Sequence, residues 1–243
     1  MMKIIRKMVD KTRSPVDCEG VTIAFLGDSV TQGCFEIYKK QNGDIETVFD
    51  KRHSYEMYVL EILNTLFPMV TVNIINAGIS GDHAARGLSR VDAHVIRHQP
   101  DLTVVCYGLN DCSDKGDSVG AYVKAMEGIF EKLKDDGGEI IYMTPNMMNT
   151  RISDHITDEA ILKIAEHTAH LQNKGIFDAH IEAAKQLCRA KNIPICDCYA
   201  LWKKLASCGV DTTELLSNKI NHPSREMNKM FAYELVKTMF AYD

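Results

Sequence analysis

A serine follows the first apolar run of the chain, where the sequence reads Gly27-Asp28-Ser29. A serine on a tight turn between a strand and a helix is a candidate nucleophile, although serine is also a preferred N-cap residue at such a place. Its hydroxyl does not ionise near neutral pH. A nucleophilic Ser29 therefore needs a base supplied by another part of the chain.

His222 can supply that base. It lies in Asn221-His222-Pro223, immediately before the last helical pattern, and Pro223 limits the freedom of the backbone there. The chain has nine histidines, and a histidine considered alone more often has a structural role than a catalytic one. What distinguishes His222 is its loop position late in a chain of alternating strands and helices, from which its ring can reach over the strand ends.

Gly81 and Asn110 complete a candidate site for developing negative charge. A tetrahedral intermediate needs preorganised donors, and the N–H of Ser29, the N–H of Gly81 and the side-chain amide of Asn110 would provide three. Structural interpretations exist for each: a turn with positive φ at Gly78 or Gly81, and an Asx-type turn at Asn110 and Asp111. Their joint occurrence after three successive predicted strands favours a shared function.

Four segments, in order, resemble the four blocks of the SGNH (GDSL-type) hydrolases: GDSVTQG, NAGISGD, GLND and a late His-Pro. The resemblance spans residues 21 to about 240. It implies a compact α/β/α sandwich with a flavodoxin-like sheet, and hydrolysis of carboxylic esters or thioesters without a metal or organic cofactor. It also implies Ser29 as nucleophile, His222 as general base, and Ser29, Gly81 and Asn110 as the oxyanion donors.

The chain departs from this family at the third member of the triad. Family members usually carry an aspartate three residues before the histidine, where this chain has Lys219. In a serine-protease triad, changing that aspartate to asparagine costs about 10⁴ in turnover because the imidazole takes the wrong tautomer.

Three interpretations of this departure remain open. His222 is oriented by Asn218 or by a backbone carbonyl, or a remote carboxylate such as Asp211 or Glu214 folds back to it, or the site is catalytically weak. We favour a Ser–His dyad with Asn218 or a carbonyl as the partner of the imidazole.

The substrate side is less defined. The polar and aromatic segment 35–55 follows the nucleophile turn directly and is predicted to border the pocket. Asp28, Asp82 and Asp111 lie next to predicted site residues and are candidate substrate-binding groups. Family breadth and the polar segment favour a short-chain or acetyl ester on a carbohydrate-like molecule, with lipid or thioester hydrolysis second. The alternative outside enzymes is a ligand-binding module with an incomplete triad.

The predicted elements place these residues at one edge of a sheet. Continuous apolar runs are typical of strands covered on both faces, and they occur at 21–26, 70–76, 102–108, 139–145 and 192–198. Helical patterns alternate with them at 54–66, 84–97, 119–135, 158–190 and 225–240, the last with Ser224 as a candidate N-cap. The alternation predicts an α/β protein, a three-layer α/β/α sandwich with a doubly wound parallel sheet of about five strands. Ligands of such sheets bind outside the carboxyl ends of the strands.

Composition excludes several classes of protein. The chain has 243 residues, 45% hydrophobic and 25% charged, which is globular rather than disordered. A net charge of -5 argues against a dedicated nucleic-acid binder. No apolar stretch approaches the roughly 18–20 residues that span a bilayer. The predicted partner is a small-molecule ester.

No linker or repeat divides the sequence, which predicts a single domain over 1–243 with residues 1–20 as an N-terminal extension. We see no secretory signal and expect a cytoplasmic protein with reduced cysteines. Cys196 and Cys198 could form half a metal site, but no second pair at zinc-finger spacing exists. We therefore predict no metal, and the family resemblance implies no cofactor. The sequence leaves the oligomeric state undecided.

Overall fold

A computed structural model describes residues 1–241, and the last two residues of the predicted domain lie outside this range. Its main sheet has the strand order β4-β1-β5-β6-β7, and all four neighbouring pairs are parallel. Numbered along the chain within this sheet, the order is 2-1-3-4-5, the flavodoxin-like order. The predicted fold class is confirmed. The strands are β1 (Val21–Gly27), β4 (Val72–Gly78), β5 (Leu102–Cys106), β6 (Glu139–Met143) and β7 (Ile195–Cys196).

The central strands β1 and β5 are buried along almost their whole length because they pack on both faces, whereas the edge strand β4 is partly exposed. In β1, Ile23 and Phe25 belong to one hydrophobic core, whereas Ala24 and Leu26 belong to the other. Successive side chains of a strand point to opposite faces, so a centrally placed strand needs apolar residues at consecutive positions.

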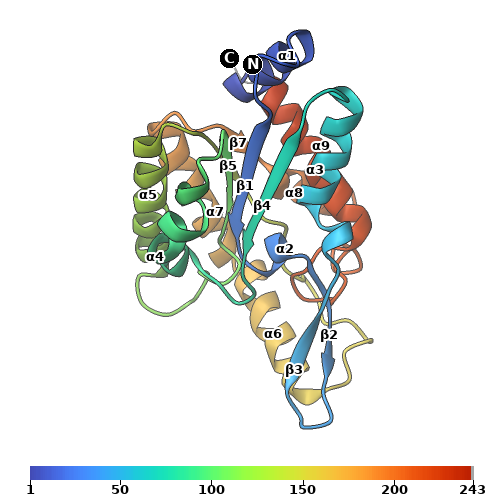
Figure 1. Ribbon diagram of the computed structural model, residues 1–243. Coiled ribbons are helices and arrows are strands. Elements are labelled where there is room, and N and C mark those ends of the chain that lie inside the picture. Colours follow the sequence, from blue (N-terminus) through green and yellow to red (C-terminus); the bar gives the residue numbers. More distant parts are fainter. Residues whose placement is uncertain (242–243) are drawn as a thin grey trace.

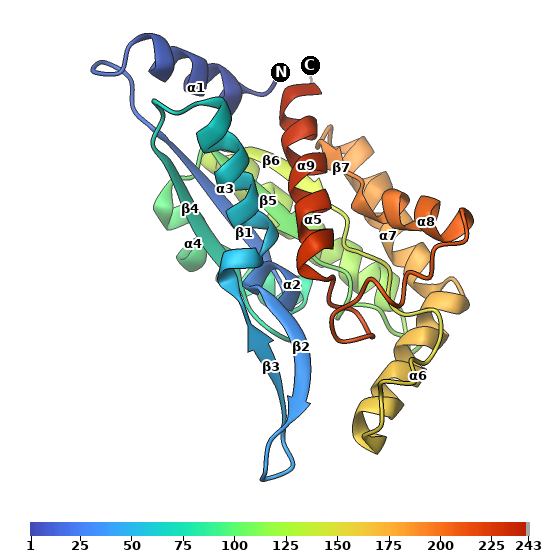
Figure 2. The same ribbon diagram turned by 90° about the vertical axis from the view of Figure 1, so that its right-hand side faces the viewer.

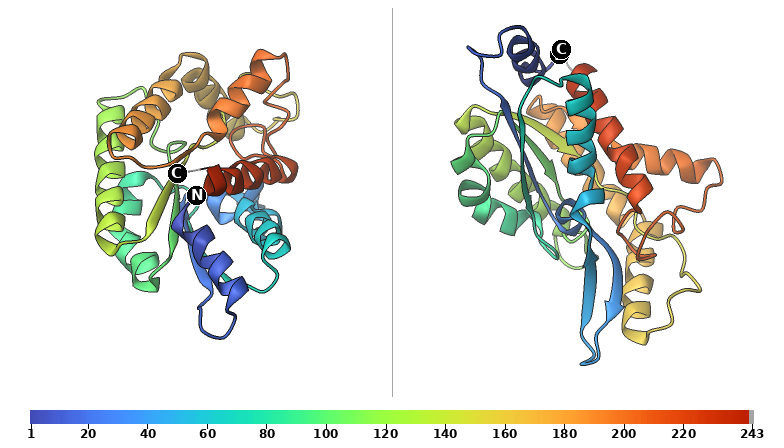
Figure 3. Two further views of the ribbon diagram at one scale, coloured as in Figure 1. Left: turned by 90° about the horizontal axis from the view of Figure 1, so that it is seen from above. Right: turned by 45° about the vertical axis from the view of Figure 1, so that its right-hand side comes forward.

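Helices cover both faces of the sheet (Figures 2 and 3). The core around Ile23 contains residues of α1 (Lys3–Arg13), α3 (Tyr55–Leu66), α8 (Cys198–Ser207) and α9 (Arg225–Ala241). The core around Leu26 contains residues of α4 (Ala84–His94) and α5 (Ser118–Asp136). Helix α7 (Ile176–Ala190) contributes to both, since Phe177 lies in the first core and Ala184 in the second.

The carboxyl ends of the strands carry additional elements (Figure 1). A short helix, α2 (Ser29–Gln32), follows β1, and an antiparallel hairpin of β2 (Cys34–Lys39) and β3 (Ile45–Phe49) follows α2. The hairpin and α6 (Glu159–Asn173) extend away from the sheet, and an ion pair of 2.7 Å joins Lys39 Nζ to Asp158, the N-cap residue of α6. The segment predicted to border the site is therefore a hairpin that continues into a 3₁₀ turn at Lys51–His53.

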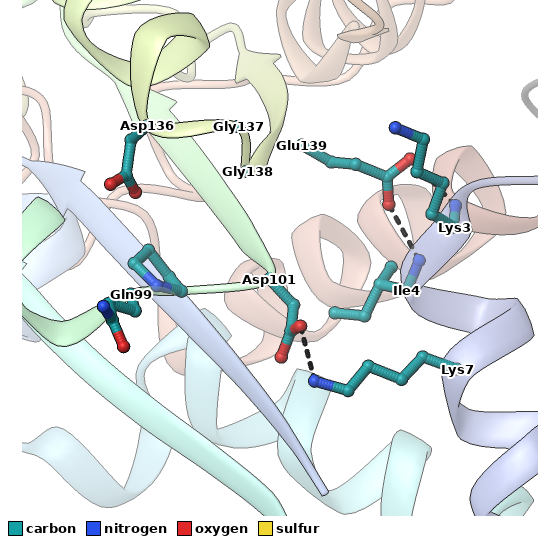
Figure 4. A pocket seen from close by; sticks show the side chains of 10 residues that line it. Lys3, Ile4, Lys7, Gln99, Asp101, Asp136, Gly137, Gly138 and Glu139 are labelled. Carbon is teal, nitrogen blue, oxygen red and sulfur yellow. Dashed lines mark hydrogen bonds and ion pairs between the residues drawn. The ribbon is translucent and has the colours of Figure 1, made fainter. Parts of the chain in front are cut away.

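Helix α1 docks at the opposite, amino end of the sheet. The N–H groups of Lys3 and Ile4 both donate to the carboxylate of Glu139, at 2.8 Å each, and Lys7 Nζ lies 2.7 Å from Asp101 (Figure 4). The hollow in Figure 4 lies between this helix and the strand ends, and its lining includes the ion pair of Lys7 and Asp101. Residues 1–20 therefore contain a packed helix for which the sequence analysis predicted no element.

Other differences from the predicted elements have local causes. The predicted helical stretch 158–190 is two helices, because Gly175 has φ 72°, in the left-handed region that favours glycine. The predicted helix 84–97 ends at His94 and continues as a 3₁₀ turn, Ile96–His98. No helix within residues 1–241 is both long enough and apolar enough to cross a membrane.

Candidate active site

Ser29 is the first residue of α2, directly after the end of β1. The cap of this helix is Asp28, whose carboxylate accepts a hydrogen bond from the Val30 N–H at 3.0 Å. The alternative role of Ser29 as the N-cap is therefore wrong. Helix α2 ends at Gly33, which has φ 86°, so the serine lies on a turn of only four residues.

Glycine at the ends of two strands allows this turn to pack closely. A Cβ at Gly78 would lie 2.3 Å from the backbone nitrogen of Gln32, and one at Gly27 would lie 2.7 Å from the carbonyl oxygen of Cys106. Gly81 differs, because its φ of 71° is left-handed and an added Cβ would meet nothing within 4 Å. Positive φ thus explains Gly81, whereas close backbone approach explains Gly78.

His222 bridges Ser29 and the hairpin. Its Nε2 lies 2.9 Å from Ser29 Oγ, and its Nδ1 lies 2.8 Å from the carbonyl oxygen of Phe35. A carbonyl oxygen can only accept a hydrogen bond, so Nδ1 carries the proton and Nε2 offers its lone pair to the serine hydroxyl. This is the tautomer that a general base beside a serine requires.

Burial keeps the imidazole neutral. His222 is 6% exposed, and burial lowers its pKa to about 4, while the Phe35 carbonyl and the nearby Glu36 charge act in the opposite direction. A neutral imidazole can accept a proton, whereas the cation cannot. The ring is therefore in its proton-accepting form at neutral pH.

Asn218 does not orient the imidazole, which corrects the prediction for this residue. Its Oδ1 accepts hydrogen bonds from the backbone N–H groups of Ile220, Asn221 and His222, at 3.0, 2.9 and 2.9 Å. Asn218 thus fixes the backbone of the loop that carries the histidine. The partner of the ring itself is a backbone carbonyl, the other alternative for a dyad.

The remote carboxylates that could have replaced the missing aspartate are paired elsewhere. Arg151 binds Asp211 and Glu214, each at 2.7 Å. The ammonium of Lys219 lies 2.8 Å from the second oxygen of Glu214. The interpretation in which Asp211 or Glu214 folds back to His222 is therefore wrong.

Three hydrogen-bond donors remain for an oxyanion. Within residues 1–241, the N–H groups of Ser29 and Gly81 donate to no protein acceptor. Asn110 Nδ2 donates one hydrogen bond, at 2.8 Å, to the carbonyl of Asp82, which fixes the amide and leaves its second N–H. Gly81 and Asn110 are exposed. They follow β4 and β5, the two neighbours of β1, so their donors lie at the same sheet edge as Ser29.

The three carboxylates proposed as substrate-binding groups have structural roles. Asp82 is fully buried and accepts hydrogen bonds from Arg90 Nε at 2.8 Å and Tyr107 at 2.9 Å. Asp28 is the buried cap of α2, and burial raises its pKa to about 7. Asp111 accepts from the Ala84 N–H at 2.9 Å, and burial raises its pKa to about 6. Burial and these hydrogen bonds give Asp28 and Asp82 structural roles, and Asp111 holds the loop that begins α4.

Sequence reasoning did not identify Phe35 as the partner of His222. A carbonyl oxygen occurs at every residue, so no residue type marks this one. The only signal in the sequence was the unusual segment 35–55 directly after the nucleophile turn. Within residues 1–241, no group of three or more histidine, cysteine, aspartate or glutamate side chains is placed to hold a metal ion.

Comparison with known proteins agrees with the fold and with the family that the sequence resembles. The model of the GDSL-like lipase/acylhydrolase family matches residues 25–230, and the chain belongs to this family. Among its relatives, an arylesterase of Vibrio mimicus is 31% identical over 113 residues, which are 45% of this chain and 55% of that protein. An acetylxylan esterase of Geobacillus stearothermophilus is 28% identical over 92 residues, 38% of this chain and 40% of that protein. The chain thus spans about half the length of the curated relatives it matches.

Solved structures share the fold over nearly the whole chain. An acetylxylan esterase from Geobacillus stearothermophilus superposes with a TM-score of 0.67 at 19% identity, covering 93% of this chain and 96% of that one. A lipase/acylhydrolase from Enterococcus faecalis has a TM-score of 0.63 at 20% identity, covering 89% and 94%.

Proposed function

We propose that the protein is a serine hydrolase that cleaves carboxylic esters through an acyl-enzyme. The observation that carries this proposal is the 2.9 Å contact between Ser29 Oγ and His222 Nε2, with the opposite ring nitrogen held by a carbonyl. Membership of the GDSL-like family and the two esterase relatives support it.

In the first half of the reaction, Ser29 Oγ attacks the acyl carbon while His222 Nε2 takes the hydroxyl proton. The carbonyl oxygen of the ester becomes an oxyanion and is stabilised by the N–H groups of Ser29, Gly81 and Asn110. The imidazolium then gives its proton to the leaving alcohol, and the bond between the acyl carbon and that alcohol breaks.

In the second half, His222 removes a proton from water, which attacks the acyl-enzyme. The second tetrahedral intermediate uses the same three donors. Its collapse releases the carboxylic acid and returns the proton to Ser29 Oγ. No step needs a metal or an organic cofactor.

For the substrate we propose an acetyl or other short-chain ester on a carbohydrate-like alcohol. The acetylxylan esterase relative supports this choice. A cavity of about 360 Å³ lies between the hairpin and the start of α6, next to the loop that carries His222. Its lining mixes side chains that can bind hydroxyl groups with aliphatic ones, and this favours a polyol over a long acyl chain. The side chains that illustrate this mixture are Ile37, His155, Ile156, Asp158 and Ser217.

The test is hydrolysis of p-nitrophenyl acetate, butyrate and octanoate, and of acetylated xylo-oligosaccharides, by the wild type and Ser29→Ala. We expect Ser29→Ala to lose about 10³-fold or more of kcat, because the nucleophile is gone. Fluorophosphonate labelling should be lost with it. Ser207→Ala, at an exposed serine of α8, is the matched control and should keep both.

Two results would contradict the proposal. Equal turnover by Ser29→Ala would move the chemistry to another residue. A well-folded wild type that neither turns over these esters nor reacts with fluorophosphonate would be a ligand-binding module.

We also infer a single domain in the cytoplasm. The family match over residues 25–230 supports one domain, and the eight cysteines, all free thiols, support a reducing compartment. Limited proteolysis that produced two stable fragments would contradict the first inference, and recovery of the native protein outside the cytoplasm would contradict the second.

A further inference from the structure

Arg225 is the first residue of α9 and lies three residues after His222. Its guanidinium forms two hydrogen bonds with the carboxylate of Glu36, at 2.6 and 3.2 Å, and a third with Asp50 at 2.8 Å. The guanidinium carbon also lies 4.3 Å from the centre of the Phe35 ring. One side chain therefore contacts Phe35 and the residue that follows it.

These contacts join α9, the helix that follows His222, to both sides of the hairpin. Glu36 lies in β2, and Asp50 follows β3. The N–H of Asp50 donates to the carbonyl of Gly33 at 2.8 Å, so the base of the hairpin is closed on the side of the nucleophile turn as well. A two-stranded hairpin alone is marginally stable in water, so its orientation depends on such contacts.

The hairpin is irregular where Phe35 lies. Cys34 pairs with Phe49 and Ile37 with Thr47, and the register shifts between these two pairs. A bulge leaves a residue out of the ladder and turns the backbone there, which is a known way to direct a group into a site. The Phe35 carbonyl lies in this irregular stretch and meets His222 Nδ1 at 2.8 Å.

We propose that Arg225 is a positioning residue that holds the Phe35 carbonyl against His222 and thereby replaces, through the hairpin, the aspartate that most family members carry at the position of Lys219. This inference rests on the proposed function. It assigns to Arg225, Glu36 and Asp50 a joint role in fixing the tautomer of the base. We call these three residues the hairpin clamp.

The contacts depend on the shape of arginine. A planar guanidinium can bind one carboxylate with two N–H groups, bind a second with Nε, and stack on a ring at the same time, whereas the ammonium of lysine cannot. The three side chains of the clamp are partly exposed, so each ion pair alone contributes little to folding. The effect that we expect is on the geometry of the site.

The test compares Arg225→Gln and Arg225→Lys with the wild type on p-nitrophenyl acetate. We expect both to lower kcat by about 10²-fold, the cost of a displacement of about 1 Å at a catalytic group, with little change in KM. Glu36→Gln should lower kcat when it is made in the wild type. In the Arg225→Gln background it should cause little further loss of kcat, because the two residues act through one contact. Arg189→Gln removes an ion pair of the same kind with Glu182 on α7 and should leave kcat unchanged.

A spectroscopic measurement separates positioning from general destabilisation. In the wild type, the Nδ1 proton of His222 should give a low-field NMR signal, assigned by its absence in His222→Gln. The signal should weaken or disappear in Arg225→Lys under conditions where circular dichroism shows the native fold. If Arg225→Gln does not fold, Arg225→Lys and Glu36→Gln carry the test.

The inference and the proposed function fail in different ways. If Ser29→Ala is inactive while the Arg225 variants keep kcat and the His222 signal, the positioning role is wrong and the hydrolase stands. If the Arg225 variants raise KM and keep kcat, Arg225 binds substrate instead. If Ser29→Ala keeps full turnover, the proposed function itself is wrong.

Discussion

Both ring nitrogens of His222 have a partner, although none of the carboxylates within residues 1–241 forms a hydrogen bond with the ring. An aspartate at Nδ1 would fix the tautomer and also stabilise the imidazolium that forms during the reaction. The Phe35 carbonyl fixes the tautomer but adds no negative charge. The structure thus separates two contributions that a Ser–His–Asp triad combines. Burial lowers the pKa of His222 to about 4.

The pH dependence of turnover should report this pKa. Because burial lowers the pKa of His222 to about 4, the ring is neutral and can accept a proton above that pH, and it loses this ability as the pH falls through about 4. We expect kcat/KM for p-nitrophenyl acetate to be level between about pH 5 and 6 and to decline below, rather than near the ordinary histidine pKa of about 6.5. The titrations of Asp111 and Asp28, with pKa values of about 6 and about 7, lie above this limb.

Reversibility is the control for this measurement. Enzyme held at pH 4 and returned to pH 7 should recover its full rate, because protonation is reversible whereas acid unfolding followed by aggregation is not. An acid limb centred at pH 6 or above would show that the ring is more exposed, or more strongly stabilised as a cation, than the contacts described here allow.

At the scale of elements, the position of Ser29 depends on how closely α2 packs against the ends of β1 and β4. Gly78→Ala tests this packing, since the added Cβ would lie 2.3 Å from Gln32 N and 2.9 Å from the carbonyl of Asp28. Both are backbone atoms, so no side-chain rotation relieves the clash and α2 must move. We expect a loss of about 1–3 kcal/mol in the free energy of unfolding and of about 10²-fold in kcat/KM.

Gly43→Ala is the matched control for Gly78→Ala. Gly43 has φ 91° in the turn of the hairpin, and an added Cβ there meets nothing within 4 Å. It should lose about 1 kcal/mol from backbone strain and keep its turnover. Equal kcat/KM for Gly78→Ala and the wild type would mean that α2 tolerates the displacement.

Helices and strands could be predicted from the sequence where their burial requires a continuous run or a regular spacing of apolar residues. All five strands of the main sheet have such a pattern, and the long helices α3, α4, α5 and α9 fall within or close to their predicted ranges. The hairpin has no such pattern, because β3 is partly exposed along its whole length. Its place is determined by contacts with residues far along the chain, such as Arg225, which no local pattern contains.

The candidate site divides in the same way. The groups proposed to do the chemistry belong to specific residue types after predicted strands, so Ser29, Gly81, Asn110 and His222 could be proposed from their positions and from the family resemblance. The orientation of His222 could not, because it depends on a backbone atom of Phe35. Asn218 was a reasonable choice by proximity in sequence, yet its oxygen is already used by three backbone N–H groups.

At the scale of the whole molecule, the candidate site lies at one end of the sheet and a packed helix covers the other. The carboxyl end carries α2, the hairpin and α6 around Ser29, whereas the amino end is closed by α1 (Figures 1 and 4). The seven residues of β1 separate these ends, a length of roughly 20 Å. Interactions at the amino end should therefore affect the stability of the molecule without changing the geometry of the site.

Ile5→Ala tests this separation. Ile5 is 1% exposed and packs in the same core as α3 and α9, so its truncation should lower the free energy of unfolding by about 2–5 kcal/mol. Urea unfolding measures this loss, with Arg6→Ala at the next, exposed position of α1 as the control that should lose little. Under native conditions kcat/KM should equal that of the wild type, because α1 docks at the amino end of the sheet, opposite to α2 and the loop of His222. A loss of turnover in folded Ile5→Ala would show that the ends of the sheet are coupled, and unchanged stability would show that α1 is not docked as described.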